Sequence, residues 1–337
     1  GNRLENETYY DPVIDATYDS VRYTHALPVN YKVKAIMQAP SDEGYFGLGS
    51  EARSLNRRGR DIQMWNSDTF SWQENWNPMY NTFPFLYAVR TNGQAYGLFF
   101  NNPARPVFRF GTQTIDGNVN QHYSFEAADG QVDYFVIGGG QDHRMPSILT
   151  RYSQLTGLPA FVPKWSLGYQ QCRWTYHSQT WIEYLAQEFT NRDFPLDVLY
   201  LDLDYFDQGY PEDIDYTGAS QLHQLTFNSQ GYWPNPAAMI NYALDRGVRI
   251  IPIIEPWINN TDPKWNEAAS NLHFVKNIID DDDAYQVVTP IFFGNVSWID
   301  FTSSAAGNWW KGKLVNFFNS YPFEGVWNDL NEPADAE

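Results

Sequence analysis

The first part of the chain alternates hydrophobic and polar positions with a period close to two. Runs rich in aromatic and β-branched residues occur at residues 31–37, 83–89, 95–100 and 132–137. Clusters containing Gly, Asn, Asp and Pro separate these runs, and no long helical stretch appears among them. Short runs of this kind between turn residues are typical of β-strands. The pattern therefore predicts an N-terminal β-sandwich domain over residues 1–143.

The pattern changes near residue 144. Residues 146–157 have helical spacing and end at Gly157, so we expect residues 144–162 to be a linker helix. Apolar strand candidates then alternate with helical stretches, the first of which begins after Ser178, an expected N-cap. The strand candidates are residues 165–171, 196–203, 248–256 and 325–330, and the helical stretches are residues 178–192, 235–247 and 303–321.

Alternation of strands and helices predicts a parallel sheet with right-handed crossovers. About four to five strand–helix units follow residue 163, whereas a closed (β/α)8 barrel contains eight. A half-barrel on its own would expose unpaired strand edges, which favour aggregation. We therefore expect residues 163–337 to form the first half of a catalytic (β/α)8 barrel. We also expect the chain to be one piece of a longer polypeptide.

Acidic residues stand at the ends of three strand candidates. Asp202 and Asp204 follow the second candidate, Glu255 follows the third, and Asp329 lies near the end of the fourth. The carboxyl ends of parallel strands carry the active site in barrels and the ligand in open doubly wound sheets. No glycine-rich phosphate-binding sequence follows any of the strands, which argues against a nucleotide site.

Composition and charge narrow the class of partner. The 337-residue chain has a net charge of −18 at pH 7, which disfavours nucleic acid and anionic membrane surfaces. No apolar run approaches the roughly 20 residues of a membrane-spanning helix. Aromatic residues make up 17% of the chain, which fits either a β-rich core or a site that stacks sugar rings. We expect a neutral substrate, no nucleic-acid partner and no membrane association.

Cysteine and glycosylation signals say little about the compartment. Cys172 is the only cysteine, so no intrachain disulfide can form, and we expect its side chain to be buried. Sequons at Asn6, Asn259 and Asn295 favour a secreted, extracellular glycoprotein, although an Asn-rich chain yields this many by chance. We interpret the acidic run Asp280–Asp283 as a solvated loop rather than a calcium site. No metal site and no cofactor are expected.

Paired carboxylates suggest glycoside chemistry, which generally uses one carboxyl group as an acid and another as a base or nucleophile. Asp329 ends a strand candidate, and Trp327 lies two residues earlier, on the same face of an alternating strand. Alternatively, Asp329 or Glu332 could cap a following helix. Spacing alone leaves both interpretations open.

Several sequence blocks resemble glycoside hydrolase family 31, the retaining α-glucosidase family. Residues 327–333, WNDLNEP, resemble its nucleophile motif, with Leu330 where Met is common. Residues 163–176, PKWSLGYQQCRWTY, resemble the segment that opens its barrel. Further blocks in family order lie at residues 44–51, 55–68, 77–85 and 194–207. The resemblance extends over most of the chain and favours the catalytic interpretation of Asp329.

The resemblance implies roles for individual residues. Asp329 would be the nucleophile that forms a covalent glycosyl-enzyme, with Glu332 supporting it and Asn331 helping to keep it ionised. The residues implied to contact substrate are Asp202, Leu203, Trp174, Trp327, Phe292 and Ile254. The implied function is a retaining α-glucosidase that acts on α-linked glucosides or oligosaccharides by double displacement and needs no cofactor.

The resemblance leaves several alternatives. We expect the general acid in the C-terminal remainder of the same protein, so this polypeptide alone should be inactive. A transglucosylase is the nearest alternative; an α-glucan lyase is disfavoured by Asn331 and Glu332, and an inactive carbohydrate-binding relative by the intact motif. Residues 292–294, Phe-Phe-Gly, replace the Trp-Pro-Gly that is usual in the family, and Glu255 replaces a common Asp. These departures leave the preferred linkage open.

Overall fold

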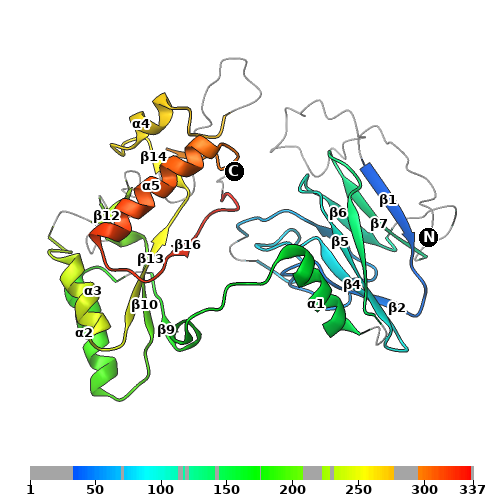
Figure 1. Ribbon diagram of the computed structural model, residues 1–337, viewed down its shortest axis with the longest axis horizontal. Coiled ribbons are helices and arrows are strands. Elements are labelled where there is room, and N and C mark those ends of the chain that lie inside the picture. Colours follow the sequence, from blue (N-terminus) through cyan, green and yellow to red (C-terminus); the bar gives the residue numbers. More distant parts are fainter. Residues whose placement is uncertain are drawn as a thin grey trace. The chain divides into compact units, whose positions relative to one another are not determined.

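The computed structural model describes residues 33–69, 72–112, 117, 121–140, 144–174, 176–207, 222–227, 231–276 and 295–334. The chain divides into two compact units, Gly1–Ala160 and Phe161–Glu337 (Figure 1). No helix within the described ranges is both long enough and apolar enough to cross a lipid bilayer.

The first unit contains two four-stranded antiparallel sheets. Their strand orders are β1-β7-β6-β3 and β2-β4-β5-β8. The first sheet comprises β1 (Val33–Gln38), β7 (His122–Ala127), β6 (Val107–Phe110) and β3 (Asp61–Gln63). The second comprises β2 (Glu43–Gly47), β4 (Phe85–Arg90), β5 (Ala95–Phe100) and β8 (Tyr134–Gly138).

Aromatic side chains fill the space between these two sheets. The ring of Tyr45 on β2 stacks on Phe110 of β6 with a centroid distance of 4.8 Å. Phe100 on β5 stacks on Phe125 of β7 at 4.4 Å. Because all four side chains are buried in one cluster, the two sheets share a single core. The predicted N-terminal β-sandwich is confirmed.

The helix α1 (Met145–Thr156) covers the opposite face of the second sheet. Strand β4 alternates, so Leu86 and Ala88 face the core of the sandwich while Phe85 faces the helix. Ile148 of α1 is fully buried against Phe85 and its neighbours. The helix that the sequence places between the domains is therefore packed on the sandwich.

The second unit is built on a parallel sheet with the order β16-β13-β10-β9. Its strands are β9 (Gln170–Gln171), β10 (Val198–Leu201), β13 (Arg249–Ile254) and β16 (Trp327–Asn328). Each parallel strand pairs with the next parallel strand along the chain, which is the connectivity of a (β/α)8 barrel. The predicted half-barrel is confirmed.

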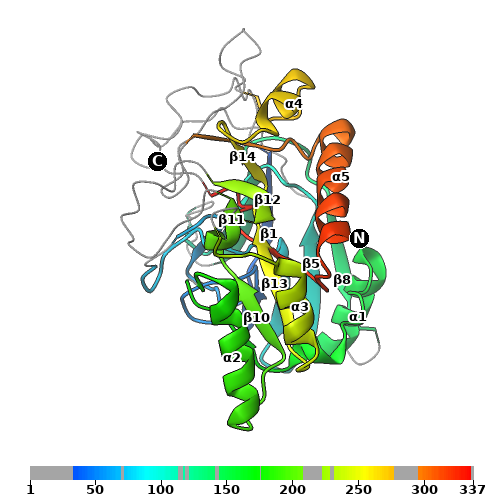
Figure 2. The same cartoon turned by 90° about the vertical axis from the view of Figure 1, so that its left-hand side faces the viewer.

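Helices connect these strands, and side-chain caps define where three of them begin. The helices are α2 (Gln179–Asn191), α3 (Pro236–Leu244), α4 (Trp265–Ser270) and α5 (Ser304–Ser320). Ser178 Oγ accepts a hydrogen bond from the Trp181 N–H at 3.2 Å, as expected for an N-cap. Asn235 and Ser303 cap α3 and α5 in the same way. Helices α2 and α3 lie side by side, and α3 packs along β13 (Figures 1 and 2).

Several segments differ from the prediction. The strand expected at residues 165–171 is wrong in its first half, because Lys164–Leu167 forms a 3-10 helix and only Gln170–Gln171 pairs with β10. Two antiparallel pairs were not predicted. They are β11 (Phe206–Asp207) with β12 (His223–Phe227), and β14 (Trp257–Asn259) with β15 (Val296–Trp298).

Candidate active site

The candidate site lies at the carboxyl ends of β10, β13 and β16. Asp202, Glu255 and Asp329 each directly follow one of these strands. The backbone N–H of Asp329 donates to the carbonyl of Ile254 at 3.0 Å, continuing the ladder between β13 and β16. This bond fixes Asp329 beside the residue that precedes Glu255. The sequence prediction that these acids share one edge of the sheet is confirmed.

Asp202 is held by the backbone and influenced by its acidic neighbours. Its Oδ1 accepts a hydrogen bond from the Leu203 N–H at 2.8 Å, capping the short 3-10 helix η2 (Leu203–Tyr205). The pKa of Asp202 is raised to about 6, chiefly by burial and to a smaller extent by the charges of Asp204 and Asp329, while the Leu203 hydrogen bond lowers it. Asp202 therefore lies within electrostatic reach of Asp329 and can still be ionised at neutral pH.

Glu255 is the most deeply buried of the three acids, with 1% of its surface exposed. Burial raises its pKa well above the usual range, and the charges of Asp329 and then Asp202 add to the effect. The indole of Trp257 acts in the opposite direction. Glu255 thus holds its proton more tightly than an exposed glutamate does, whereas a nucleophile must be ionised.

Two residues that hold this region together were missed by sequence reasoning. Gln224 on β12 is fully buried; its Oε1 accepts from the Glu255 N–H at 2.8 Å and its Nε2 donates to the Trp257 carbonyl at 2.7 Å. Tyr205 is also fully buried, and its hydroxyl donates to the Ile253 carbonyl at 2.7 Å. In the sequence, the alternation in HQLTF (His223–Phe227) was the signal for the strand that carries Gln224. The strand that pairs with it, β11, has only two residues, which are too few to indicate a hairpin.

The segment after β16 places the remaining motif residues. Trp327 is half-buried and meets Tyr200 edge-on, with ring centroids 5.8 Å apart at 84°. Leu330 adopts a left-handed conformation with φ 51°, which turns the chain after Asp329. Asn331 is exposed and Glu332 is half-buried in this turn. Residues 331–333 form a turn, and the residues after Ala334 lie outside the described part of the chain, so the helix-capping alternative is not tested.

The strand end after β9 presents an exposed surface. Trp174 is 45% exposed, which suits the substrate contact implied for it, and Arg173 is exposed as well. Cys172 is also exposed, so the expectation of a buried cysteine is wrong. It follows the end of a two-residue edge strand, where no described strand covers it. Partial burial nevertheless raises the pKa of its thiol to about 11, with Asp202 and Asp329 contributing.

The other residues implied to contact substrate differ in accessibility. Leu203 and Ile254 are buried, with 7% and 3% of their surfaces exposed. Their contacts with substrate stay a prediction. Phe292 and the acidic run Asp280–Asp283 lie outside the described residues.

Asp300, in the segment before α5, has a local structural role. Its Oδ1 accepts a hydrogen bond from the Thr302 N–H at 2.9 Å, closing a turn before α5. Within the described ranges, no group of three or more His, Cys, Asp or Glu side chains is arranged to hold a metal ion.

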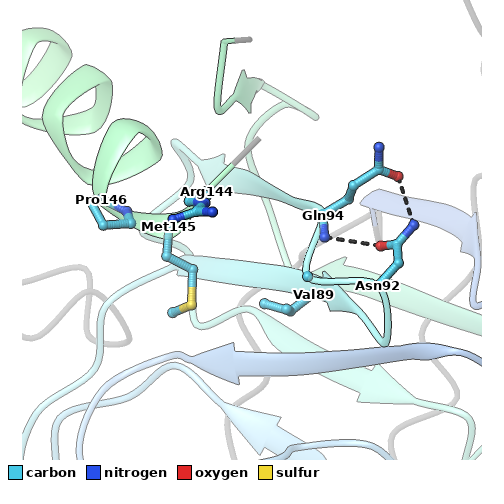
Figure 3. Close-up of a pocket in the computed structure, with 7 residues that line it drawn as sticks. Val89, Asn92, Gln94, Arg144, Met145 and Pro146 are labelled. Atoms are coloured by element: carbon cyan, nitrogen blue, oxygen red, sulfur yellow. Dashed lines mark hydrogen bonds between the residues drawn. The ribbon is translucent and has the colours of Figure 1, made fainter. Parts of the chain in front are cut away.

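The first unit contains a pocket that none of these acids lines. It lies between the turn from β4 to β5 and the start of α1 (Figure 3). Asn92 donates to Gln94 Oε1 and accepts from the Gln94 N–H, both at 3.0 Å, which closes the turn on itself. The pocket is lined by Val89, Asn92, Gly93, Gln94, Arg144, Met145 and Pro146. It contains no carboxylate suited to glycoside chemistry.

Comparison with known proteins decides the family. The sequence model of the glycosyl hydrolases family 31 TIM-barrel domain matches residues 159–337, which is more than half of the chain and includes all three acids. The chain belongs to glycosyl hydrolase family 31. A second model, the glycosyl hydrolase 31 N-terminal galactose mutarotase-like domain, matches residues 12–108. The resemblance noted in the sequence is confirmed.

The family 31 relatives include enzymes with different names. Alpha-glucosidase 2 of Bacillus thermoamyloliquefaciens is 32% identical over 86% of this chain and 34% of its own length. An isomaltosyltransferase of Sporosarcina globispora is 25% identical over 92% of this chain and 28% of its own length. A solved GH31 dextranase of Flavobacterium johnsoniae, complexed with isomaltotriose, is 30% identical with a TM-score of 0.76, over 91% of this chain and 34% of the dextranase. This chain thus spans about a third of the relatives' lengths.

Proposed function

We propose that the complete protein is a retaining α-glucosidase that acts on α-linked glucosides or oligosaccharides. The observation that carries the proposal is the position of Asp329 at the end of β16, hydrogen-bonded to Ile254 and within electrostatic reach of Asp202. Support also comes from the α-glucosidase among the family 31 relatives.

The proposed reaction proceeds by double displacement. A carboxylate oxygen of Asp329 attacks the anomeric carbon, the bond to the leaving oxygen breaks, and a general acid protonates that oxygen. Water then attacks the same carbon, the ester bond to Asp329 breaks, and the general acid residue takes the proton from the water. Retention of configuration follows from the two inversions.

Each carboxyl group has a proposed part in this reaction. Asp202, with a pKa of about 6, is ionised at neutral pH and can accept hydrogen bonds from sugar hydroxyls. Glu332 supports the turn that holds the nucleophile, and Trp174 and Trp327 offer flat faces for sugar rings. Glu255 is too deeply buried to reach a leaving group. We place the general acid in the C-terminal remainder of the same protein.

The nucleophile assignment is tested by trapping the intermediate. The complete protein is incubated with 5-fluoro-α-glucosyl fluoride, digested and analysed by peptide mass spectrometry. We expect the sugar on the peptide that contains Asp329, and no adduct in the Asp329→Asn variant. An adduct on another carboxyl group, or turnover without any adduct, contradicts the proposal.

A transglucosylase is the second candidate. The isomaltosyltransferase relative supports it, because its similarity extends over 92% of this chain. In this reaction a sugar hydroxyl replaces water in the second step, and Asp329 keeps the same role. The dextranase relative, solved with isomaltotriose, makes α-1,6-linked oligosaccharides the first alternative substrates to compare with maltose.

A secreted, glycosylated state also stays a proposal, and the sequons give it uneven support. Asn259 is fully buried, and its Oδ1 accepts from the Thr261 N–H at 2.9 Å. A glycan on Asn259 is incompatible with this packing. Asn295 is exposed and could carry one, whereas Asn6 lies outside the described residues.

A further inference from the structure

Helix α2 carries two aromatic side chains that the proposed reaction does not use. Trp181 is 43% exposed and Tyr184 is 50% exposed. Their ring centroids lie 5.7 Å apart, and the ring planes are inclined by 31°. Residues three apart on a helix share a face, so the two rings form one continuous surface. Leaving two large aromatic side chains in water forgoes the free energy of burying them, which makes the pair a candidate binding surface.

The other faces of α2 are already used for packing. One face packs on the parallel sheet through Ile182 and Ala186, which are both fully buried. Helix α3 lies along one flank of α2 (Figure 2). There Gln187 Oε1 accepts a hydrogen bond from the Tyr242 hydroxyl at 3.2 Å. The aromatic pair lies on the remaining face, so neither the sheet nor α3 covers it.

The connectivity relates this pair to the candidate active site. Because α2 follows a parallel strand, it begins at the carboxyl edge of the sheet, where Asp202 and Asp329 lie. Trp181 lies in the first turn of α2, where its N–H is capped by Ser178. Trp174, which is also exposed, lies in the connection from β9 to α2. Exposed aromatic side chains thus occur both at the edge that carries the acids and on the helix that leaves it.

The chemistry of this surface favours a neutral, curved sugar chain. Aromatic rings stack on the apolar faces of sugar rings, and the indole N–H and the phenol hydroxyl can bond to sugar hydroxyls. On the next turn of α2, Glu188 is paired with Arg192 at 2.9 Å, so these two residues add no net charge. Successive rings of an α-linked glucan are inclined to one another, as the two side chains are, whereas a β-1,4-linked glucan is flat.

We propose that Trp181 and Tyr184 form a second carbohydrate-binding surface, which holds α-linked glucan chains while the carboxyl groups act on a chain elsewhere. The surface raises the local concentration of long substrates and takes no part in the reaction of short ones. The choice of an α-linked glucan as the ligand rests on the proposed function, whereas the exposed, inclined pair of rings is observed independently of it.

Binding is measured by affinity electrophoresis in gels that contain amylopectin. The complete protein carries Asp329→Asn, which prevents turnover, and we expect amylopectin to retard this parent. Adding Trp181→Ala and Tyr184→Ala together should weaken the apparent affinity about tenfold, because both stacking faces are lost. Phe194→Ala is the matched control, since Phe194 is an exposed aromatic residue beyond the opposite end of α2. It should leave the retardation unchanged.

Kinetics of the complete protein with Asp329 intact provide a second measurement. The Trp181→Ala, Tyr184→Ala double variant should raise KM for starch several-fold and leave kcat/KM for maltose unchanged. An equal fall in kcat/KM for both substrates overturns the proposal, because it places the pair in the reaction site.

Two results in the gel also overturn it. One is a parent that amylopectin does not retard. The other is a double variant retarded as strongly as its parent; a lower thermal midpoint of that variant would then show that the rest of the protein covers the pair. Failure to cleave maltose and starch alike would instead reject the proposed function, while the gel still tests the surface.

Discussion

Two carboxyl groups at the strand ends, those of Asp202 and Glu255, differ in the hydrogen bonds that their oxygens accept. Asp202 Oδ1 has a backbone donor at 2.8 Å, and part of the side chain remains accessible. Glu255 has no comparable bond with a described group and is almost completely enclosed. Chemically similar side chains thus have different protonation behaviour because their surroundings differ.

The raised pKa of Asp202 makes stability depend on pH. Its pKa is about 6 in the folded protein against 3.8 for the unperturbed group, so the folded state binds the proton more tightly. The stabilisation that the bound proton gives the folded state is complete below about pH 4 and is lost as the pH rises through about 6. It amounts to about 2–3 kcal/mol at most. Asparagine cannot ionise. The substitution Asp202→Asn should therefore raise the thermal midpoint of the complete protein more at pH 7 than at pH 4, while weakening substrate binding.

Thermal unfolding at pH 4 and pH 7 checks this prediction. Asp42→Asn, at an exposed position in the turn between β1 and β2, serves as the control and should change the midpoint little at either pH. Equal shifts for Asp202→Asn at both pH values would show that Asp202 does not bind its proton more tightly in the folded state.

For individual residues, the sequence correctly predicted where each acid lies along its strand, but not how deeply a side chain is buried. Strand patterns were sufficient to place Asp202, Glu255 and Asp329 at one edge. The exposure of Cys172 was predicted wrongly, because burial depends on which other strands cover an edge. The raised pKa of Glu255 was not predictable either, since it depends on burial of the side chain and on the nearby charges of Asp329 and Asp202.

At the scale of elements, the contact between α1 and the sandwich depends on a missing side chain. Gly97 lies on β5 beneath α1, and a Cβ at this position would be 2.6 Å from Ile148 Cγ2 and 3.0 Å from Phe85. Real Cβ atoms do not approach so closely, so α1 can seat Ile148 against the sheet only because residue 97 is Gly.

We expect Gly97→Ala to destabilise the first unit by about 1–3 kcal/mol, because it overpacks this contact. Hydrogen exchange of the α1 amides in the complete protein should become faster. Gly138→Ala on the adjacent strand β8 is a matched control, since its Cβ would meet nothing within 4 Å. In an Ile148→Ala background, which lacks the Cγ2 atom, Gly97→Ala should cost less than it does alone; exchange unchanged in all variants would disprove the close contact.

Element-level prediction was best where the period was clear. The runs at residues 83–89 and 95–100 correspond to β4 and β5, whose side chains alternate between the two faces of the sheet. Strand β7 was missed because five of its six residues are buried, which removes the alternation. The error at residues 165–171 has a local cause. The chain after Pro163 forms a 3-10 turn closed by the Gly168 N–H bonded to the Trp165 carbonyl.

At the scale of the whole molecule, the acidic chain suits a neutral substrate better than an anionic one. Family 31 membership limits the chemistry, but the relatives include an alpha-glucosidase and an isomaltosyltransferase. The two reactions share the first step and differ in the acceptor of the second. The acceptor therefore decides the activity of the complete protein.

Product analysis distinguishes these activities. Incubation of the complete protein with maltose, isomaltose, nigerose and starch should release glucose as the main product, since water is the proposed acceptor. The Asp329→Asn variant should form neither glucose nor transfer products. Oligosaccharides longer than the substrate as main products would favour the transglucosylase instead.

The sequence by itself determined the β-sandwich, the order of the parallel strands, the family and the acids at the strand ends. These features depend on local periodicity and on short motifs, which a single chain displays directly. Only the tertiary structure decided that Gln224 fixes the backbone of Glu255, that α1 packs on the sandwich, and that Asn259 is buried. Such features depend on burial and on contacts between distant segments, because the free energy of a charged or polar group depends on what encloses it.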